Sequence, residues 1–210
     1  MDEFITVNKD GKFEEVINKS RFLSRAYRVE TEQDVQAALL AQKKEFPDAR
    51  HHCWAYILGE KGMNMRYSDD GEPQGTAGQP MLEVIKKRNL TNTLVVVTRY
   101  FGGILLGAGG LARAYTSGAV GALNDAGIAT FADTFFVDVT LEYNTFSKNE
   151  KKIRQHQEIR IENIEYLQAV TLHCLIKVQD VKESENFFVS ISDGRAKIQE
   201  IKREFVLWEL

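Results

Sequence analysis

The sequence predicts an α+β protein of two domains, and three observations lead to that prediction. The chain has 210 residues, of which 43% are hydrophobic, and this is enough apolar material for two modest cores. A continuous, mostly β-branched run at residues 94–98 is typical of a strand that is covered on both faces. The second half of the chain shows the order βαββαβ, which is the ferredoxin-like arrangement. We expect domains at residues 1–130 and 134–210.

The first elements follow from local periodicity. Apolar and polar positions alternate in three short segments, which predicts three antiparallel strands. The segments are 4–7, 15–18 and 22–25. A helix of about sixteen residues should follow. Thr31 is a suitable N-cap with Asp34 three positions later, and apolar residues recur at helical spacing until Pro47.

The rest of the first domain is predicted from strand runs and glycines. We expect two strands joined by the hairpin loop Gly59-Glu60-Lys61-Gly62, a polar loop, a helix and a central strand. A glycine-rich segment and a second helix of small residues come next, and these small residues let the helix backbone approach the sheet. Gly127 is a natural C-cap for that helix. These elements span residues 52–58, 63–67, 68–78, 79–88, 94–98, 102–110 and 111–126.

The second domain is predicted as strand, helix, two strands, helix and strand. The segments are 135–141, 145–157, 160–166, 169–178, 181–192 and 197–206. Asn144 and Asp180 are expected N-caps, and Glu183 completes a capping-box pattern with Asp180.

Charge and composition exclude several classes of protein. The formal net charge is −3 and the pI is about 5.9, so no global positive field attracts DNA or an anionic membrane. The N-terminal residues lack a signal-peptide pattern, and no apolar run is long enough to span a bilayer. Cys53 and Cys174 lie far apart and are expected to be two buried thiols. We therefore expect a cytoplasmic protein without a membrane partner.

The glycine-rich segment is the first candidate site. A buried strand that leads through glycines into a helix points backbone N–H groups at an anion, and the glycines let the anion approach. Arg99 and Arg113 would supply positive charge beside it. The glycines that define this candidate are Gly102, Gly103, Gly107, Gly109 and Gly110. The spacing matches neither nucleotide-binding fingerprint, so a tight strand-to-helix connection remains the alternative.

Four stretches of the first domain resemble the YigZ/IMPACT family. They are TRYFGGILLGAGGLARAY at 98–115, YSDDGEPQGTAGQP at 67–80, KSRF at 19–22 and HHCWAY at 51–56. The resemblance implies a first domain with the fold of ribosomal protein S5 domain 2, followed by a ferredoxin-like domain. Leu105 departs from the family pattern, in which we expect lysine, and this removes one cation from the proposed anion site.

The second motif contains three acidic residues close together, Asp69, Asp70 and Glu72. Carboxylates at this density can hold a hydrated Mg²⁺, which would pair with a phosphate on the glycine-rich segment. The same residues are also common in turns, where their side chains cap backbone N–H groups, and this alternative is preferred.

The third motif, His51-His52-Cys53, suggests a metal site or a nucleophile. On a strand, His51 and Cys53 face one side and His52 the other, so the three cannot converge on one ion. Cys53 would need a base, and His51 is the available partner. A half-buried strand with a polar edge is the simpler interpretation.

Basic side chains offer a possible nucleic-acid surface on the sheet. Lys19, Arg21 and Arg66, together with Arg99, would contact phosphates, and Tyr100 would offer a stacking face. In an acidic chain, scattered basic residues are more often a solvated surface.

Three functions remain open at this stage. The resemblance implies a regulatory binding protein linked to translation, since the eukaryotic relatives restrain activation of a kinase that shuts down initiation. We expect contact with RNA, the ribosome or a translation-associated protein, by fold analogy. The alternative is a small phosphate- or nucleotide-binding enzyme with Mg²⁺ as its cofactor, although the sequence shows no recognisable set of catalytic residues. A third possibility is a docking module without a small ligand.

Overall fold

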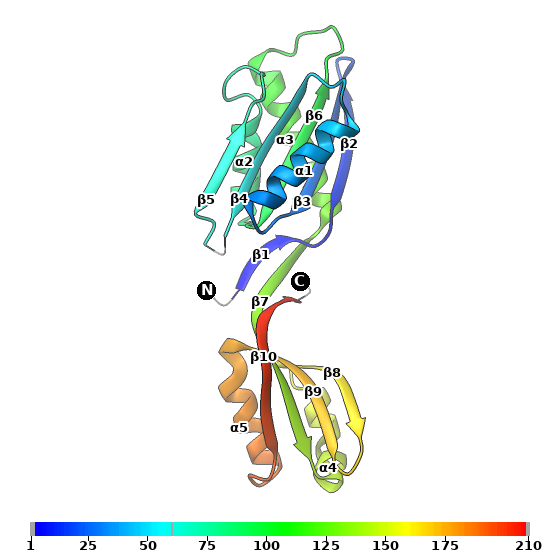
Figure 1. The fold of residues 1–210 in the computed structure, drawn as a ribbon, viewed down its shortest axis with the longest axis vertical. Coiled ribbons are helices and arrows are strands. Elements are labelled where there is room, and N and C mark those ends of the chain that lie inside the picture. The colour runs from blue at the N-terminus through cyan, green and yellow to red at the C-terminus, as the bar shows by residue number, and fades with distance from the viewer. Residues whose placement is uncertain (1–2, 60, 209–210) are drawn as a thin grey trace. The chain divides into compact units, whose positions relative to one another are not determined.

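The structure is a computed structural model that describes residues 3–59 and 61–208 (Figure 1). Glu60, which belongs to the expected hairpin loop, lies outside the described residues. The described chain forms two compact units, with the boundary between Thr130 and Phe131. Each unit contains both strands and helices. The predicted α+β class is confirmed.

The first unit is built on an antiparallel sheet with the strand order β2-β3-β6-β4-β5. The strands are β2 (Gly11–Ile17), β3 (Ser20–Arg28), β4 (His51–Leu58), β5 (Asn64–Ser68) and β6 (Thr93–Tyr100). The β-branched strand β6 is central, as predicted, and its residues 93–99 are all buried. Asn18 and Lys19 join β2 to β3 with φ angles of 46° and 63°, the left-handed backbone of a tight hairpin.

The three predicted N-terminal strands are present, but only β2 and β3 pair with each other. Strand β1 (Glu3–Val7) lies beside β7 (Ile128–Leu141) and not beside β2. The reason is a pair of backbone hydrogen bonds that follow β1. Asn8 and Lys9 donate their N–H groups to the carbonyls of Gly127 and Ala126, so the chain turns toward the end of a helix instead of closing a hairpin.

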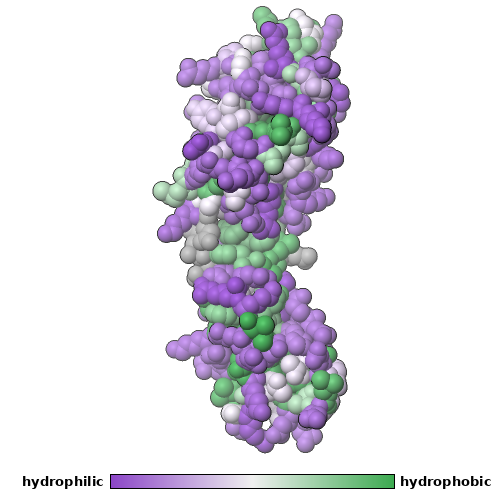
Figure 2. Space-filling model, in the orientation of Figure 1, coloured by the Kyte–Doolittle hydropathy of each residue, from purple (hydrophilic) through white to green (hydrophobic). Residues whose placement is uncertain are grey.

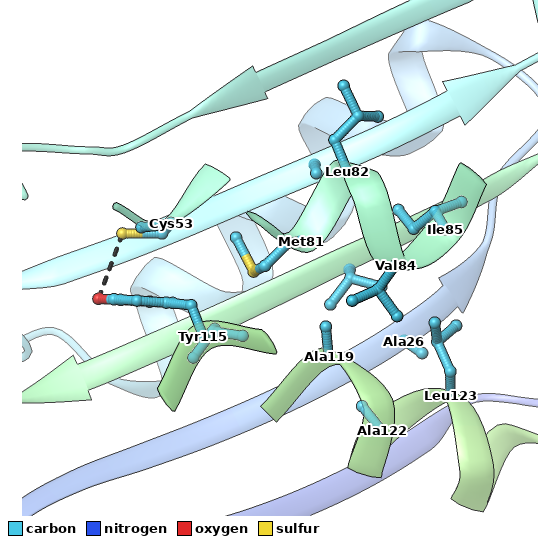
Figure 3. Close-up of a cluster of buried hydrophobic side chains, with 14 of the residues drawn as sticks. Ala26, Cys53, Met81, Leu82, Val84, Ile85, Tyr115, Ala119, Ala122 and Leu123 are labelled. Atoms are coloured by element: carbon cyan, nitrogen blue, oxygen red, sulfur yellow. Dashed lines mark hydrogen bonds between the residues drawn. The ribbon is translucent and has the colours of Figure 1, made fainter. Parts of the chain in front are cut away.

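Helices cover both faces of this sheet (Figure 1). On one face lies α1 (Glu32–Glu45), which begins with the predicted capping box of Thr31 and Asp34. On the other lie α2 (Gly78–Lys87) and α3 (Gly107–Ala126), whose side chains form the main core (Figure 3). The small residues of α3 do bring it close to the sheet, because a Cβ on Gly121 would lie 2.3 Å from the ring of Phe13.

Helix α3 begins four residues earlier than predicted. Gly107, Gly109 and Gly110 therefore belong to its first turn and not to a loop. The helix ends at Gly127, whose φ of 67° fits the predicted C-cap.

The second unit has the ferredoxin-like strand order β10-β7-β9-β8. Its further elements are α4 (Tyr143–Arg154), β8 (Ile159–Tyr166), β9 (Val170–Lys177), a short 3-10 turn (Val178–Asp180), α5 (Val181–Ile191) and β10 (Lys197–Trp208). The predicted order is confirmed, but two caps were wrong. Glu142, not Asn144, precedes α4, and Asp180 makes no side-chain hydrogen bond to the first turn of α5, so the capping box with Glu183 does not form.

Polar and apolar residues share the surface of the described chain. Figure 2 shows hydrophilic residues over most of the displayed face of the first unit, with a few hydrophobic ones among them. Among the described residues no helix has the length and apolar character to cross a bilayer.

Candidate functional site

The segment between β6 and α3 is held against the hairpin of β2 and β3. A Cβ on Gly102 would lie 2.0 Å from the carbonyl carbon of Lys19, so only glycine allows this close approach. Ser20 fixes the contact, because its Oγ accepts a hydrogen bond from the N–H of Gly102 at 3.1 Å. Gly103 follows with a φ of 83°, which favours glycine. The KSRF motif thus positions the glycine-rich segment.

A buried ion pair lies beneath this segment. Nη1 of Arg99 donates to Oε1 of Glu72 at 2.6 Å, and both side chains are about 5% exposed or less. Tyr115 donates its hydroxyl to the same Oε1 at 2.8 Å, and Nη2 of Arg99 donates to Oγ of Ser20 at 3.2 Å. The guanidinium also lies over the ring of Phe22, 5.4 Å from its centre. Arg99 therefore neutralises Glu72, and its charge is not available as the free cation of an anion site.

The acidic loop is built around backbone hydrogen bonds. The carboxylate of Asp69 accepts from the N–H groups of Gly75, Ala77 and Gly78 at 2.8–3.0 Å, and so caps the start of α2. Oδ2 of Asp70 accepts from the N–H of His52 at 2.7 Å.

These contacts decide between the two interpretations of the acidic loop. Asp69 and Asp70 accept hydrogen bonds from backbone N–H groups, and Glu72 forms an ion pair with Arg99. Within residues 3–59 and 61–208, no three His, Cys, Asp or Glu side chains are grouped to hold a metal ion. The loop thus forms the turn and cap that were the preferred interpretation of its composition, and the Mg²⁺ site stays a prediction.

The three residues of the His-His-Cys motif have separate roles. Nδ1 of His51 lies 2.8 Å from the carbonyl oxygen of Asp70, and because a carbonyl only accepts, Nδ1 donates in this hydrogen bond. His52 is buried against Thr98, and burial lowers its pKa. Burial also raises the pKa of the Cys53 thiol, which lies 3.4 Å from the hydroxyl of Tyr115 (Figure 3). Cys53 is fully buried, whereas a nucleophilic thiol needs access and a lowered pKa, so its environment does not favour that role.

The predicted basic residues do not gather into one patch. Arg21 pairs with Glu14 and Arg66 pairs with Glu32. Arg21 lies opposite Tyr100 in the sheet, whereas Arg66 is in register with Leu94, six residues along β6. This separation is roughly 20 Å along the strands. Lys19 is exposed at the hairpin turn, and Arg113 is exposed on the second turn of α3.

A cleft of about 300 Å³ opens between the acidic loop and the start of α3. Glu72 and Arg99 line it together with His51 and Arg50, and apolar side chains make up much of the remaining wall. Those apolar residues are Pro73, Phe101, Leu105, Leu106, Ala108 and Leu111. Leu105, where the family pattern led us to expect lysine, is 85% exposed at this cleft.

Sequence reasoning missed four residues of this site, which are Ser20, Arg50, Phe101 and Tyr115. Ser20, Phe101 and Tyr115 lay inside recognised motifs, but nothing in their residue types showed that they would meet Arg99 and Glu72. Arg50 gave only a weak signal, as a basic residue next to the His-His-Cys strand.

Known proteins match this chain over most of its length. The profile of the Impact N-terminal domain matches residues 18–123. IMPACT family member YvyE of Bacillus subtilis is 38% identical over 95% of this chain and 92% of its own. IMPACT family member YigZ of Escherichia coli is 34% identical over 90% of this chain and 93% of its own. A solved structure described as a hypothetical protein is 30% identical, with a TM-score of 0.61, over 97% of this chain and all of that one.

Proposed function

This chain belongs to the IMPACT family, and from that premise we propose that it is a regulatory binding protein linked to translation. It contacts RNA or a ribosome-associated factor, and it does so in the cytoplasm. Residues 1–130 carry the contact through the cleft, and residues 134–210 act as a second module with a ferredoxin-like sheet. The translation link rests on the family resemblance.

One observation supports the proposal that the cleft is the contact site. The four family motifs are spread over almost a hundred residues, yet Ser20, His51, Glu72 and Arg99 all reach this cleft or hold its floor. A tight strand-to-helix connection alone would not need a histidine, an aromatic ring and a buried ion pair around an open space of about 300 Å³. Ligand pockets commonly combine apolar walls with a few polar groups in this way.

The chemistry of the cleft favours RNA among the possible partners. Phe101 is an exposed aromatic ring and Arg50 an exposed cation at the cleft. Arg113 does not line the cleft but is exposed on the second turn of the helix that begins there, and neither arginine has an ion pair in the described part of the chain. Single-stranded RNA is commonly bound by stacking its bases on such rings and pairing its phosphates with arginine. The enzyme alternative is less well supported, because the carboxylates that it would use are engaged with the backbone and Arg99.

The proposal is tested by sedimentation of ribosomes in a sucrose gradient. The wild-type protein should migrate with a ribosomal or RNA-containing fraction, and nuclease treatment should release it if RNA is the partner. The double variant Arg50→Ala/Arg113→Ala should shift to the top of the gradient. A matched control is Arg66→Ala, which removes an exposed arginine far from the cleft. Failure of the wild type to co-migrate would contradict the proposal.

A further inference from the structure

The floor of the cleft contains an unused hydrogen-bond acceptor. Both donors to Glu72, which are Arg99 and Tyr115, bind Oε1. Within residues 3–59 and 61–208 no group donates to Oε2, although the side chain is only 4% exposed and lines the cleft. Oε2 is not fully buried, so a donor on a ligand in the cleft can reach it.

A second unsatisfied group lies at the same floor. Nε of Arg99 is buried and has no partner in the described chain. The Arg99–Glu72 pair therefore has one accessible acceptor, Oε2, and one buried donor without a partner, whereas buried polar groups in folded proteins are normally paired. The accessible acceptor at the bottom of the cleft points to a ligand that carries a hydrogen-bond donor.

The walls of the cleft suit a flat apolar group. Pro73, Leu106 and Leu111 contribute apolar surface, and Phe101 keeps 41% of its surface exposed while the guanidinium of Arg99 lies 5.5 Å from its ring centre. The volume of about 300 Å³ lies at the lower end for ligand pockets, and is enough for one base with its sugar.

The rim of the cleft suits a phosphate. Arg50 lines it, as do Gly107 and Ala108 in the first turn of α3. Leu106, the residue before this turn, has no side chain that accepts from the first N–H groups, so these donors lack a side-chain cap within residues 3–59 and 61–208. The helix dipole adds positive potential at the same place.

We propose that the cleft binds one nucleotide, with an amino-bearing base on Glu72 and the phosphate at Arg50 and the start of α3. This deepens the function proposed above and rests on it. The amino group of adenine, cytosine or guanine donates to Oε2 of Glu72, while the ring packs against Phe101, as in other pockets that hold an unstacked base. Uracil is disfavoured, because two carbonyl oxygens flank its N–H and would approach the carboxylate.

The test measures the affinity of the full chain for AMP, CMP, GMP and UMP by calorimetry. AMP, CMP or GMP should bind at least about fivefold more tightly than UMP. Phe101→Ala should weaken that binding by about fivefold or more, since a stacked base is lost. Glu72→Gln should lower the ratio of AMP to UMP affinity, because the amide presents a donor where the carboxylate presents an acceptor.

Two further arms separate the possible outcomes. Oligoadenylate that binds at least tenfold more tightly than AMP would identify RNA as the source of the nucleotide, and equal affinity would identify the free nucleotide. Equal affinity for all four nucleotides, or an unchanged affinity in Phe101→Ala, would overturn the pocket assignment. RNA binding that persists without base preference would overturn this inference while leaving the proposed function intact. If Glu72→Gln fails to fold, the affinity of Phe101→Ala still tests the pocket, because Phe101 is exposed.

Discussion

The hydroxyl of Tyr115 donates a hydrogen bond to Oε1 of Glu72 at 2.8 Å, and this contact joins helix α3 to the acidic loop. Tyr115 is fully buried, packs edge-on against Phe22 at 5.5 Å between ring centres, and has a pKa that burial raises. The two family motifs at 67–80 and 98–115 are thus connected through one buried phenol.

Removing this hydroxyl should destabilise the first unit. Tyr115→Phe takes one of two donors from a buried carboxylate, and we expect a loss of about 1–3 kcal/mol in the free energy of unfolding. Urea denaturation measures the loss. Tyr67→Phe is the matched control, because Tyr67 is exposed and its hydroxyl makes no hydrogen bond in the described chain. An equal, small effect of both substitutions would contradict the role of Tyr115.

Asp69 should behave as a helix cap and not as a metal ligand. Asp69→Ala leaves three N–H groups at the start of α2 without their acceptor, and should cost about 2 kcal/mol. Asp48→Ala, which removes an exposed carboxylate, should cost less than about 0.5 kcal/mol. Addition of Mg²⁺ should leave the melting temperature of the wild type unchanged. A melting temperature that rises with Mg²⁺ only when Asp69 is present would refute this assignment.

Two glycines of α3 should respond oppositely to alanine. A Cβ on Gly121 would lie 2.3 Å from the ring of Phe13, so Gly121→Ala must displace the ring or the helix and should cost about 1–3 kcal/mol. Gly109 is exposed in the same helix, with Nη1 of Arg113 as the nearest atom at 3.7 Å. Gly109→Ala should raise stability by about 0.5–1 kcal/mol. Thermal melts of both variants test the prediction, which fails if Gly121→Ala is neutral.

The two buried thiols should make the protein less stable at alkaline pH. Burial raises the pKa of Cys174 from 9.0 to about 12, and it raises that of Cys53 as well. Between about pH 9 and 12 the unfolded chain loses these protons while the folded chain keeps them. The free energy of unfolding should therefore fall as the pH rises, by up to about 1.4 kcal/mol per pH unit for each thiol. Cys174→Ala should show a shallower fall over this range, and an identical slope would contradict the prediction.

The sequence predicted the order of the elements because that order depends on local periodicity. The buried run of β6, the capping box at Thr31 and the βαββαβ order of the second unit are all local signals. The placement of β1 was not predictable, because it depends on contacts with Ala126 and Gly127 that are distant in sequence. The first turn of α3 was missed because glycines are poor helix formers.

The sequence motifs that form the candidate site were predictable, but the interactions of their individual side chains were not. Composition could not show whether Asp69 faces backbone N–H groups or solvent, nor that Arg99 would be neutralised by Glu72. These roles depend on side-chain directions that arise only when distant segments pack together. Arg50 and Phe101 became candidates only when the cleft was visible.

The central claim is that the cleft of the first unit is the contact site, and NMR mapping with a short single-stranded RNA tests it most directly. The predicted result is that amide shifts change at residues 50–51, 71–72 and 101–111, and that Arg50→Ala/Arg113→Ala suppresses them. Shift changes confined to other parts of the chain, such as the lysine-rich helix α4, would contradict the account.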